Sequence, residues 1–207
     1  MKINVIGTTG MVGTQAVAEA AARGHEVVAY SRSGKAVEGA AYATGLDMAD
    51  TVRVVEAVNG ADVTIIAVSA GRDGQDPQPV IDAYRALIAA QPAARIIAVG
   101  GAGSLNADEA GALIKDTPSF PADYYPEANA FATILQEFRN SDGVDWTVVA
   151  PSSEIAPGTR TGEYVTADDV PAGEGVSVED FAIALIDEAE NPTHRQARFT
   201  VASNGLA

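Results

Sequence analysis

Three glycines spaced three residues apart lie close to the N-terminus of the chain. They belong to the segment Gly7-Thr8-Thr9-Gly10-Met11-Val12-Gly13, which follows a short apolar run and opens a helix-like stretch. Glycine lets the backbone turn tightly and lets a pyrophosphate approach main-chain N–H groups at the positive end of a helix dipole. Strand, turn, helix and second strand fall within about 30 residues, as in dinucleotide-binding units. The segment therefore predicts a dinucleotide site, and a plain strand-to-helix turn is the alternative.

The end of the second predicted strand decides which dinucleotide is favoured. NAD binders usually place an acidic residue there for the ribose 2′-hydroxyl, whereas a basic side chain accommodates the 2′-phosphate of NADP. The sequence has Ser31, Arg32 and Ser33 at this point and no acid. A guanidinium can pair with phosphate oxygens, and the serine hydroxyls can add hydrogen bonds. We expect NADP(H) to be preferred over NAD(H); the alternative is that Arg32 only solvates a turn.

The ends of the third and fourth predicted strands supply further candidates for cofactor contacts. The third ends in Leu46-Asp47-Met48. The Asp47 carboxylate can accept a hydrogen bond from the adenine amino group, and a helix-capping role for Asp47 or Asp50 is the alternative. The fourth ends in Val68-Ser69-Ala70, whose small residues would let the cofactor cross the edge of the sheet.

The fifth predicted strand ends in a glycine-rich turn, Gly100-Gly101-Ala102-Gly103-Ser104-Leu105. This turn lies at the level where the nicotinamide is expected. Ser104 is accordingly a candidate for contact with the nicotinamide or the substrate. The alternative is that this serine only forms the turn.

Short motifs along almost the whole chain resemble those of one family. Besides the glycine triplet and the turn at 100–105, they are Asp116-Thr117-Pro118, Phe120-Pro121, Glu127-Ala128, Asp145-Trp146-Thr147, Pro157-Gly158-x-Arg160-Thr161-Gly162 and Arg198-Phe199-Thr200-Val201. Together they resemble the NADH-flavin reductases, atypical short-chain dehydrogenases related to NmrA-like regulators. The resemblance implies a Rossmann fold, NAD(P)H binding and reduction of flavins, quinones or similar acceptors.

Ordinary short-chain dehydrogenases reduce carbonyls with a tyrosine whose proton is made available by a lysine four residues later. In this chain the residues four positions after the six tyrosines are Gly34, Leu46, Ile88, Ala128, Asn129 and Asp168. A Tyr-Lys pair of that spacing is therefore missing. Reduction of a flavin or quinone does not require a Tyr-Lys pair, because hydride passes to an electrophilic ring and the proton can come from solvent. The protein then mainly orients the two rings.

Two tyrosines and one arginine are candidates for the acceptor site. Tyr124 and Tyr125 begin the helix that carries the Tyr-Lys pair in ordinary relatives; they either line the acceptor site or pack beneath the segment 151–175. Arg160, between two glycines, either holds a phosphate or an anionic acceptor over the nicotinamide or forms a structural salt bridge.

The elements that position these residues alternate along the chain. Near-continuous apolar runs predict strands at 3–6, 26–30, 62–69, 95–100 and 144–149, with a short third strand ending at 46–48. Helical spacing and composition predict helices at 11–23, 50–59, 77–91, 124–141 and 177–190. We therefore expect an α/β fold with a doubly wound parallel sheet, a Rossmann fold, in a single domain over residues 1–207.

The C-terminal part is less regular. Residues 151–175 are rich in proline and glycine, which predicts a loop-and-hairpin excursion over the carboxyl edge of the sheet and a lid over the acceptor site. The helix at 177–190 opens with Ser177, with Asp180 three residues on, close to a capping box. Phe199-Thr200-Val201 is interpreted as a last edge strand.

Charge and composition limit the partners. The 207 residues include 28 acidic and 13 basic side chains, which gives a formal net charge of −15. This balance argues against binding to nucleic acid or to an anionic membrane surface. The chain has no cysteine, so disulfides and thiolate ligands are excluded, and the isolated His25 and His194 suggest no metal site. Without a membrane-length apolar run or a signal peptide, we expect a cytoplasmic protein.

The sequence as a whole predicts an NAD(P)H-dependent oxidoreductase that transfers hydride to a small planar acceptor such as a quinone or a flavin (FMN, FAD or riboflavin). The alternative is a non-catalytic NAD(P)-binding sensor of the NmrA-like type, which the lack of an evident proton donor keeps open. The oligomeric state is left open, a homodimer included.

Overall fold

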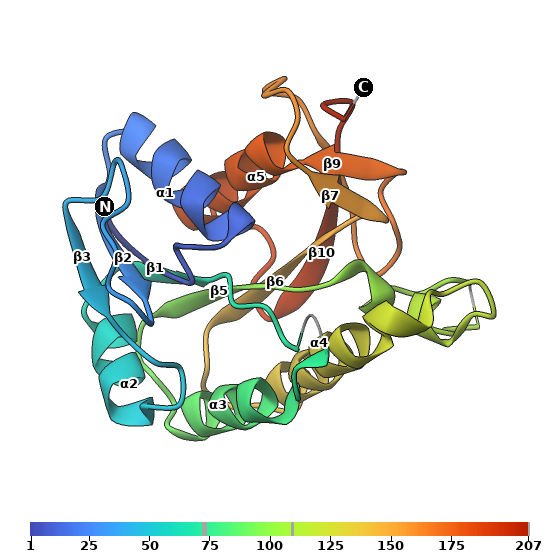
Figure 1. Ribbon diagram of the computed structural model, residues 1–207, viewed down its shortest axis with the longest axis horizontal. Helices are drawn as coiled ribbons and strands as arrows, with labels where there is room; N and C mark the ends of the chain where they lie inside the picture. Colours follow the sequence, from blue (N-terminus) through green and yellow to red (C-terminus); the bar gives the residue numbers. More distant parts are fainter. Residues whose placement is uncertain (72–73, 109, 207) are drawn as a thin grey trace.

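The computed structural model describes residues 1–71, 74–108 and 110–206, which are organised around one large sheet (Figure 1). The strands are β1 (Lys2–Ile6), β2 (Glu26–Ser31), β3 (Tyr42–Gly45), β4 (Val63–Ile66), β5 (Arg95–Val99), β6 (Trp146–Pro151), β7 (Glu154–Ala156), β8 (Val165–Ala167), β9 (Gly175–Ser177) and β10 (Ala197–Ala202). The helices are α1 (Met11–Ala22), α2 (Thr51–Asn59), α3 (Gln78–Ala89), α4 (Tyr125–Arg139) and α5 (Val178–Glu190), and the short 3-10 turns are η2 (Ala102–Ser104), η3 (Ile114–Asp116) and η4 (Ala122–Tyr124).

The large sheet has the order β3-β2-β1-β4-β5-β6-β10-β8. Its strands pair in parallel, apart from β8, which pairs antiparallel with β10. The strand order reverses at β1 and β4, so the carboxyl ends of these two strands flank the point where doubly wound sheets bind ligands. The predicted α/β fold with a doubly wound, mostly parallel sheet is confirmed.

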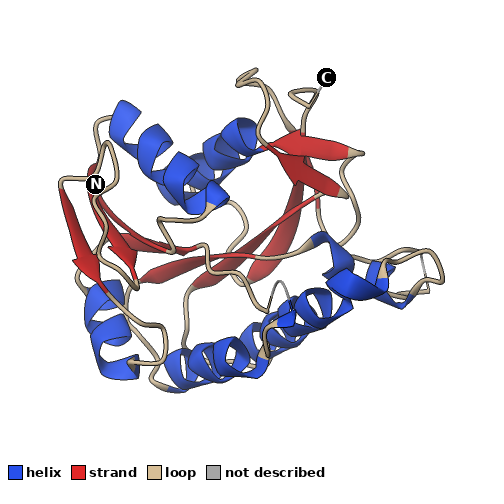
Figure 2. Cartoon of the chain, viewed as in Figure 1, coloured by secondary structure: helices blue, strands red, loops and turns tan. Residues whose placement is uncertain are grey.

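Helices cover both faces of the sheet (Figure 2). α1 and α5 lie on one face, and α2, α3 and α4 lie on the other. Side chains of one strand alternate between the two cores: Ile3 and Val5 pack toward α1 and α5, whereas Ile6 belongs to the opposite cluster. This double burial explains why the strands are almost continuously apolar. Trp146 begins β6 and is 2 % exposed, so it belongs to the core on the α2, α3 and α4 face.

Two predicted helix boundaries are visible in detail. Helix α1 ends at its C-cap Arg23, and Gly24 follows with a left-handed φ of +80°, which glycine adopts without strain. Helix α5 begins after Ser177, whose Oγ accepts a hydrogen bond from the backbone N–H of Asp180 at 3.1 Å. The Asp180 side chain is buried, and its carboxylate accepts instead from the backbone N–H groups of Thr161 and Gly162 at 2.8 and 3.0 Å.

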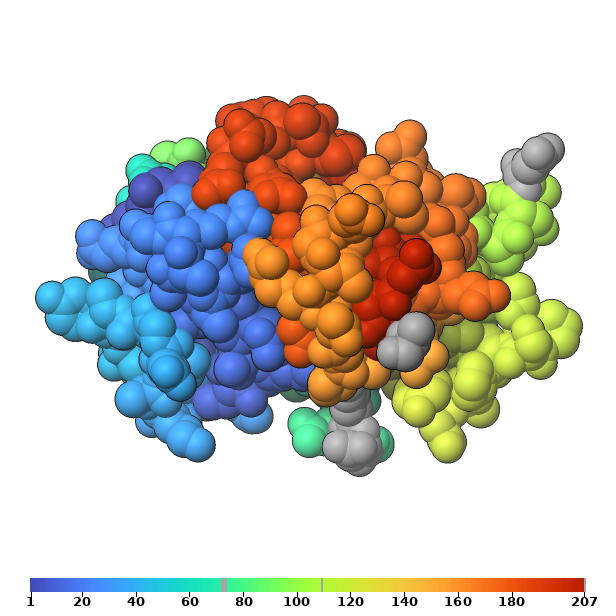
Figure 3. Space-filling view, turned by 90° about the horizontal axis from the view of Figure 1, so that it is seen from above, coloured from blue at the N-terminus to red at the C-terminus, as the bar shows by residue number. Residues whose placement is uncertain are grey.

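The C-terminal part differs from expectation in two respects. Strand β10 is not an edge strand, because β8 from the 151–175 segment adds to the sheet beyond it. The excursion also contains no hairpin among its described strands: β7 pairs in parallel with β9, as a separate two-stranded sheet. Seen from above, the excursion lies beside the N-terminal residues and on both sides of the end of the chain (Figure 3). Pairing over a long loop leaves no short-range pattern in the sequence.

Candidate functional site

The glycine loop connects β1 to α1 and is held against the end of β2. The backbone N–H groups of Gly7 and Thr8 both donate to the Tyr30 carbonyl, at 2.8 and 3.2 Å. The Thr14 hydroxyl lies 2.9 Å from the carbonyl oxygens of both Thr8 and Gly10. The loop is therefore fixed from both sides, next to the residues expected to meet the adenosine ribose.

Two of the three glycines are required by the chain itself. Gly7 has a φ of +96°, and a Cβ there would lie 2.3 Å from the Ala67 carbonyl oxygen. A Cβ at Gly13 would lie 2.3 Å from the Gly7 carbonyl oxygen. Both positions bring backbone segments closer together than any side chain permits, so these glycines let β1, β4 and α1 converge.

Gly10 is different, because internal packing does not require it. A Cβ at Gly10 would meet nothing closer than the Gly7 carbonyl oxygen at 3.4 Å, an ordinary contact. Gly10 is also the N-cap of α1 and has no side chain to accept hydrogen bonds from the first turn. The flanking Thr9 and Met11 are exposed. An open, positively polarised helix start behind a bare glycine fits the pyrophosphate of a dinucleotide.

The end of β2 presents the predicted ribose-binding residues. Ser31 is buried, and its hydroxyl lies 3.4 Å from that of Ser33, whereas Arg32 is exposed. A second cation lies here that was not predicted, Arg53, which donates to the Gly45 carbonyl at 2.6 Å. Its position in the first turn of α2 was the available signal, because that turn begins at the same edge of the sheet.

The third strand ends earlier than expected, at Gly45, so Asp47 and Met48 follow β3 rather than end it. Met48 is buried in the core. The Asp47 carboxylate accepts from the backbone N–H of Ala49 at 2.9 Å, in a local turn. The helix cap is Asp50, whose side chain accepts from the N–H of Arg53 at 3.2 Å.

The end of β4 lies beside the glycine loop, and β5 is the next strand in the sheet. Of the three residues predicted after β4, Ser69 is exposed, Val68 is half-buried and Ala70 is buried. The glycines after β5 are explained by packing: a Cβ at Gly100 would lie 2.8 Å from Val148 and one at Gly101 would lie 2.7 Å from the Phe131 ring.

Ser104 is buried and its hydroxyl is already engaged. The hydroxyl donates to the Gly101 carbonyl at 2.7 Å and lies 3.0 Å from an amino nitrogen of Arg198, which also donates to the Ser104 carbonyl at 2.6 Å. Arg198 binds Asp169 of the excursion as well, with 2.8 Å between Nε and Oδ1. Burial lowers the pKa of Arg198, and the ion pair with Asp169 offsets only part of this effect. In the described structure, Ser104 thus acts as a turn former, and Arg198 is a positioning residue that sequence reasoning missed.

Tyr124 and Tyr125 lie at the start of α4 and are exposed, at 62 % and 42 %. Tyr125 has an unexpected neighbour, Lys115 of η3, whose Nζ lies 5.0 Å from the centre of its ring. Only 9 % of Lys115 is exposed. The two residues are ten positions apart with prolines between them, so spacing could not reveal the contact.

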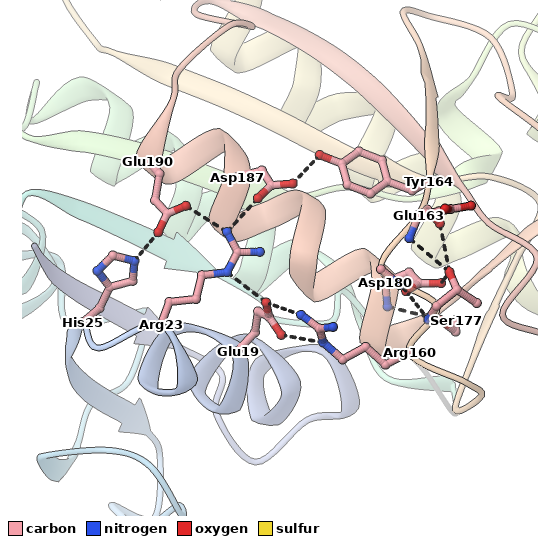
Figure 4. Close-up of polar contacts among 12 residues, drawn as sticks. Glu19, Arg23, His25, Arg160, Glu163, Tyr164, Ser177, Asp180, Asp187 and Glu190 are labelled. Atoms are coloured by element: carbon pink, nitrogen blue, oxygen red, sulfur yellow. Dashed lines mark hydrogen bonds and ion pairs between the residues drawn. The ribbon is translucent and has the colours of Figure 1, made fainter.

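Arg160 forms a structural salt bridge, which was the alternative to a contact with the acceptor. Its guanidinium makes a two-point contact with the Glu19 carboxylate of α1, at 3.0 and 2.9 Å (Figure 4). Burial alone raises the pKa of Glu19, but the hydrogen bonds from Arg160 and Arg23 outweigh it and lower that pKa. Arg23 continues the network to Asp187 and Glu190 of α5, at 2.6 and 2.8 Å. The described contacts place Arg160 on the face covered by α1 and α5.

A hollow of about 850 Å³ lies between the excursion and the C-terminal residues, with Glu154, Glu163, Glu174 and Leu206 in its wall. None of the predicted site residues lines it. Within residues 1–71, 74–108 and 110–206, no group of three His, Cys, Asp or Glu side chains is arranged to hold a metal ion. In the same described ranges, none of the helices has the length and hydrophobicity needed to span a membrane.

Comparison with known proteins places the chain in a family. A family model described as NAD(P)H-binding matches residues 7–192. The uncharacterized protein YwnB of Bacillus subtilis (strain 168) is 37 % identical over 213 residues, which cover 98 % of this chain and 99 % of that protein.

Two solved structures are also similar over nearly their full length. SP1627 of Streptococcus pneumoniae TIGR4, provisionally described as an NADH-flavin reductase, has a TM-score of 0.87 and 32 % identity, covering 99 % of this chain and 100 % of that one. A protein of Bacteroides thetaiotaomicron, provisionally described as an epimerase, has a TM-score of 0.84 and 31 % identity, covering 100 % and 97 %. With its glycine loop at the start of the matched region, this chain belongs to the NAD(P)H-binding family.

Proposed function

We propose that the protein is an NAD(P)H-dependent oxidoreductase that prefers NADPH and reduces a flavin, a quinone or a similar planar acceptor. One observation carries the proposal: the start of α1 is open behind Gly10, although internal packing would accept a side chain there. The description of SP1627 as an NADH-flavin reductase supports the reaction class.

Different groups of residues would hold different parts of the cofactor. The backbone N–H groups at the start of α1 would hold the pyrophosphate, and Arg32 with Ser33 would hold the 2′-phosphate. The turn at 100–105, fixed by Arg198, would position the nicotinamide end beside the acceptor. When bound, the cofactor supplies a hydride, and the protein orients the two rings for its transfer.

The excursion at 151–175 is proposed to cover the acceptor. Its attachment to Asp180 through Thr161 and Gly162 gives it a fixed base on α5. Covering the reacting rings would exclude water during hydride transfer. Hydrogen exchange in this segment should become slower when NADPH is added, and equally slow exchange in both states would contradict the lid.

Steady-state oxidation of NADPH with a panel of FMN, riboflavin and quinones tests the reaction. We expect oxidation above background with at least one acceptor class. Tight NADPH binding without any acceptor-dependent oxidation would favour a cofactor sensor over an enzyme.

A further inference from the structure

Lys115 is a buried lysine at the edge of the sheet where the cofactor is proposed to bind. Its ammonium lies 2.7 Å from Oδ1 of Asp116 and 5.0 Å from the centre of the Tyr125 ring. The Tyr125 hydroxyl lies 3.5 Å from the same Asp116 oxygen. Lysine is rarely buried unless its charge is paired, and a cation within about 6 Å of a tyrosine ring is attracted to it. We call Lys115, Asp116 and Tyr125 the Lys115 cluster.

The Lys115 cluster lies next to the turn at 100–105. A Cβ at Gly103 would lie 2.6 Å from the Cβ of Ala128, so this part of α4 packs directly on the turn. Tyr125 precedes Ala128 by three residues and therefore shares its face of the helix. Because α4 precedes a parallel strand, its first turn lies at the carboxyl edge of the sheet. The half-exposed Tyr125 is thus within reach of an acceptor bound beside the end of β5.

The charges in the cluster suit a proton donor. Burial alone lowers the pKa of Lys115, but interactions with Asp116 and Tyr125 outweigh it and raise that pKa. Lys115 is therefore an ammonium at neutral pH. The Lys115 ammonium, 5.0 Å from the centre of the Tyr125 ring, would stabilise the phenolate that forms once Tyr125 has given its proton to the acceptor. The Asp116 carboxylate accepts from both groups and holds them together.

We propose that Tyr125 is the catalytic proton donor, with Lys115 and Asp116 as positioning residues, and that the acceptor is a quinone or a conjugated carbonyl compound. This inference rests on the proposed function and narrows its substrate class. An acceptor of this class gains negative charge on an oxygen when hydride adds to its ring or double bond, and that oxygen needs a proton.

The proposed step transfers one hydride and one proton to the acceptor. Hydride from NADPH forms a C–H bond on the acceptor, and the electron pair it displaces moves to the carbonyl oxygen. The O–H bond of Tyr125 breaks and a new O–H bond forms on that oxygen. The Lys115 ammonium stabilises the phenolate, which regains a proton from solvent through the exposed side of the ring. NADPH, one proton and the acceptor are converted to NADP⁺ and the reduced acceptor.

Turnover of a quinone at saturating NADPH tests the assignment. We expect Tyr125→Phe to lower kcat by roughly 100-fold, as loss of a general acid typically does, with little change in KM. Lys115→Met should also lower kcat, and Lys115→Arg should restore part of it by returning the positive charge. Tyr42→Phe removes a hydroxyl from a tyrosine that is 70 % exposed on β3 and serves as the matched control, with unchanged kcat.

A second measurement needs no turnover. In the cofactor-free protein, NMR of the Lys115 ammonium should show that Asp116→Asn lowers the pKa of Lys115, and that Tyr125→Phe lowers it by a smaller amount. An unchanged pKa of Lys115 in both variants would contradict the cluster itself.

The outcomes separate the two proposals. Wild-type protein without acceptor-dependent oxidation would overturn the proposed function and the proton donor together. Wild-type turnover with an undiminished kcat in Tyr125→Phe would overturn the proton donor alone and leave the oxidoreductase in place.

Discussion

The two halves of the proposed cofactor edge are built in different ways. In the glycine loop, the hydrogen bonds join residues close in sequence, such as Thr14 to Thr8, with the end of β2 as the next neighbour. At the turn after β5, the deciding contact joins Arg198 to Ser104 across 94 positions. A short sequence motif is enough to predict the glycine loop, whereas the turn after β5 is held by a contact that forms only when the sheet is complete. The two halves should therefore respond differently to substitution.

Gly7→Ala should have the largest effect, because it damages the first half at its tightest point. The new Cβ would lie 2.3 Å from the Ala67 carbonyl oxygen, on a backbone with a φ of +96°. We expect a loss of about 3 kcal/mol or more in the free energy of unfolding, together with loss of NADPH binding. Urea unfolding and a fluorescence titration of NADPH measure the two effects.

Gly24→Ala is the matched control for the backbone conformation. Its φ is +80°, but a Cβ there meets nothing within 4 Å. The expected cost is about 1 kcal/mol, from the left-handed conformation alone, with unchanged NADPH binding. Equal losses at the two glycines would mean that close approach of the loop to β4 is not what requires Gly7.

Arg198→Met should damage the second half and spare the first. Removing the buried guanidinium leaves the Ser104 carbonyl and Asp169 without this partner, which should cost about 2–3 kcal/mol in unfolding free energy. Acceptor reduction should fall more than NADPH affinity, because the glycine loop is untouched. Arg139→Met removes a more exposed cation from the same Asp169 and should cost about 1 kcal/mol at most. A parallel loss of NADPH affinity and turnover in Arg198→Met would show that the halves are not separable.

The ion pair between Glu19 and Arg160 should give a smaller, pH-dependent effect. The pKa of Glu19 is lowered in the folded protein, so its stabilisation is complete above the ordinary value of 4.5 and is lost as the pH falls through the lower folded pKa. Glu19→Gln should cost about 1 kcal/mol at pH 7, and less as the pH falls below 4.5. Glu38→Gln removes the same charge from an exposed position and is the control. A difference from wild type that does not shrink in acid would exclude this origin.

Sequence reasoning succeeded where the physical cause is local. Apolar runs and helical spacing located the main strands and helices, and the glycine segment connects β1 to α1 as predicted. It failed where a partner comes from a distant element. The pairing of β8 with β10, the contact of Lys115 with Tyr125 and the hold of Arg198 on Ser104 each require the folded chain. Arg53 was predictable in part. The sequence places it in the first turn of the helix α2, but its contact with the Gly45 carbonyl requires the folded chain.

Comparison of NADPH and NADH affinities tests most directly whether this edge binds a phosphorylated dinucleotide. A phosphate near a chain of net charge −15 needs a local cation, and the exposed Arg32 is placed to provide it. Arg32→Ala should weaken NADPH by roughly 10- to 100-fold, the effect of about 1.5–3 kcal/mol from one charge-assisted contact, and leave NADH nearly unchanged. Arg85→Ala, which removes a cation on α3, should change neither Kd. Equal losses for both cofactors in Arg32→Ala, or no loss for either, would contradict the assignment.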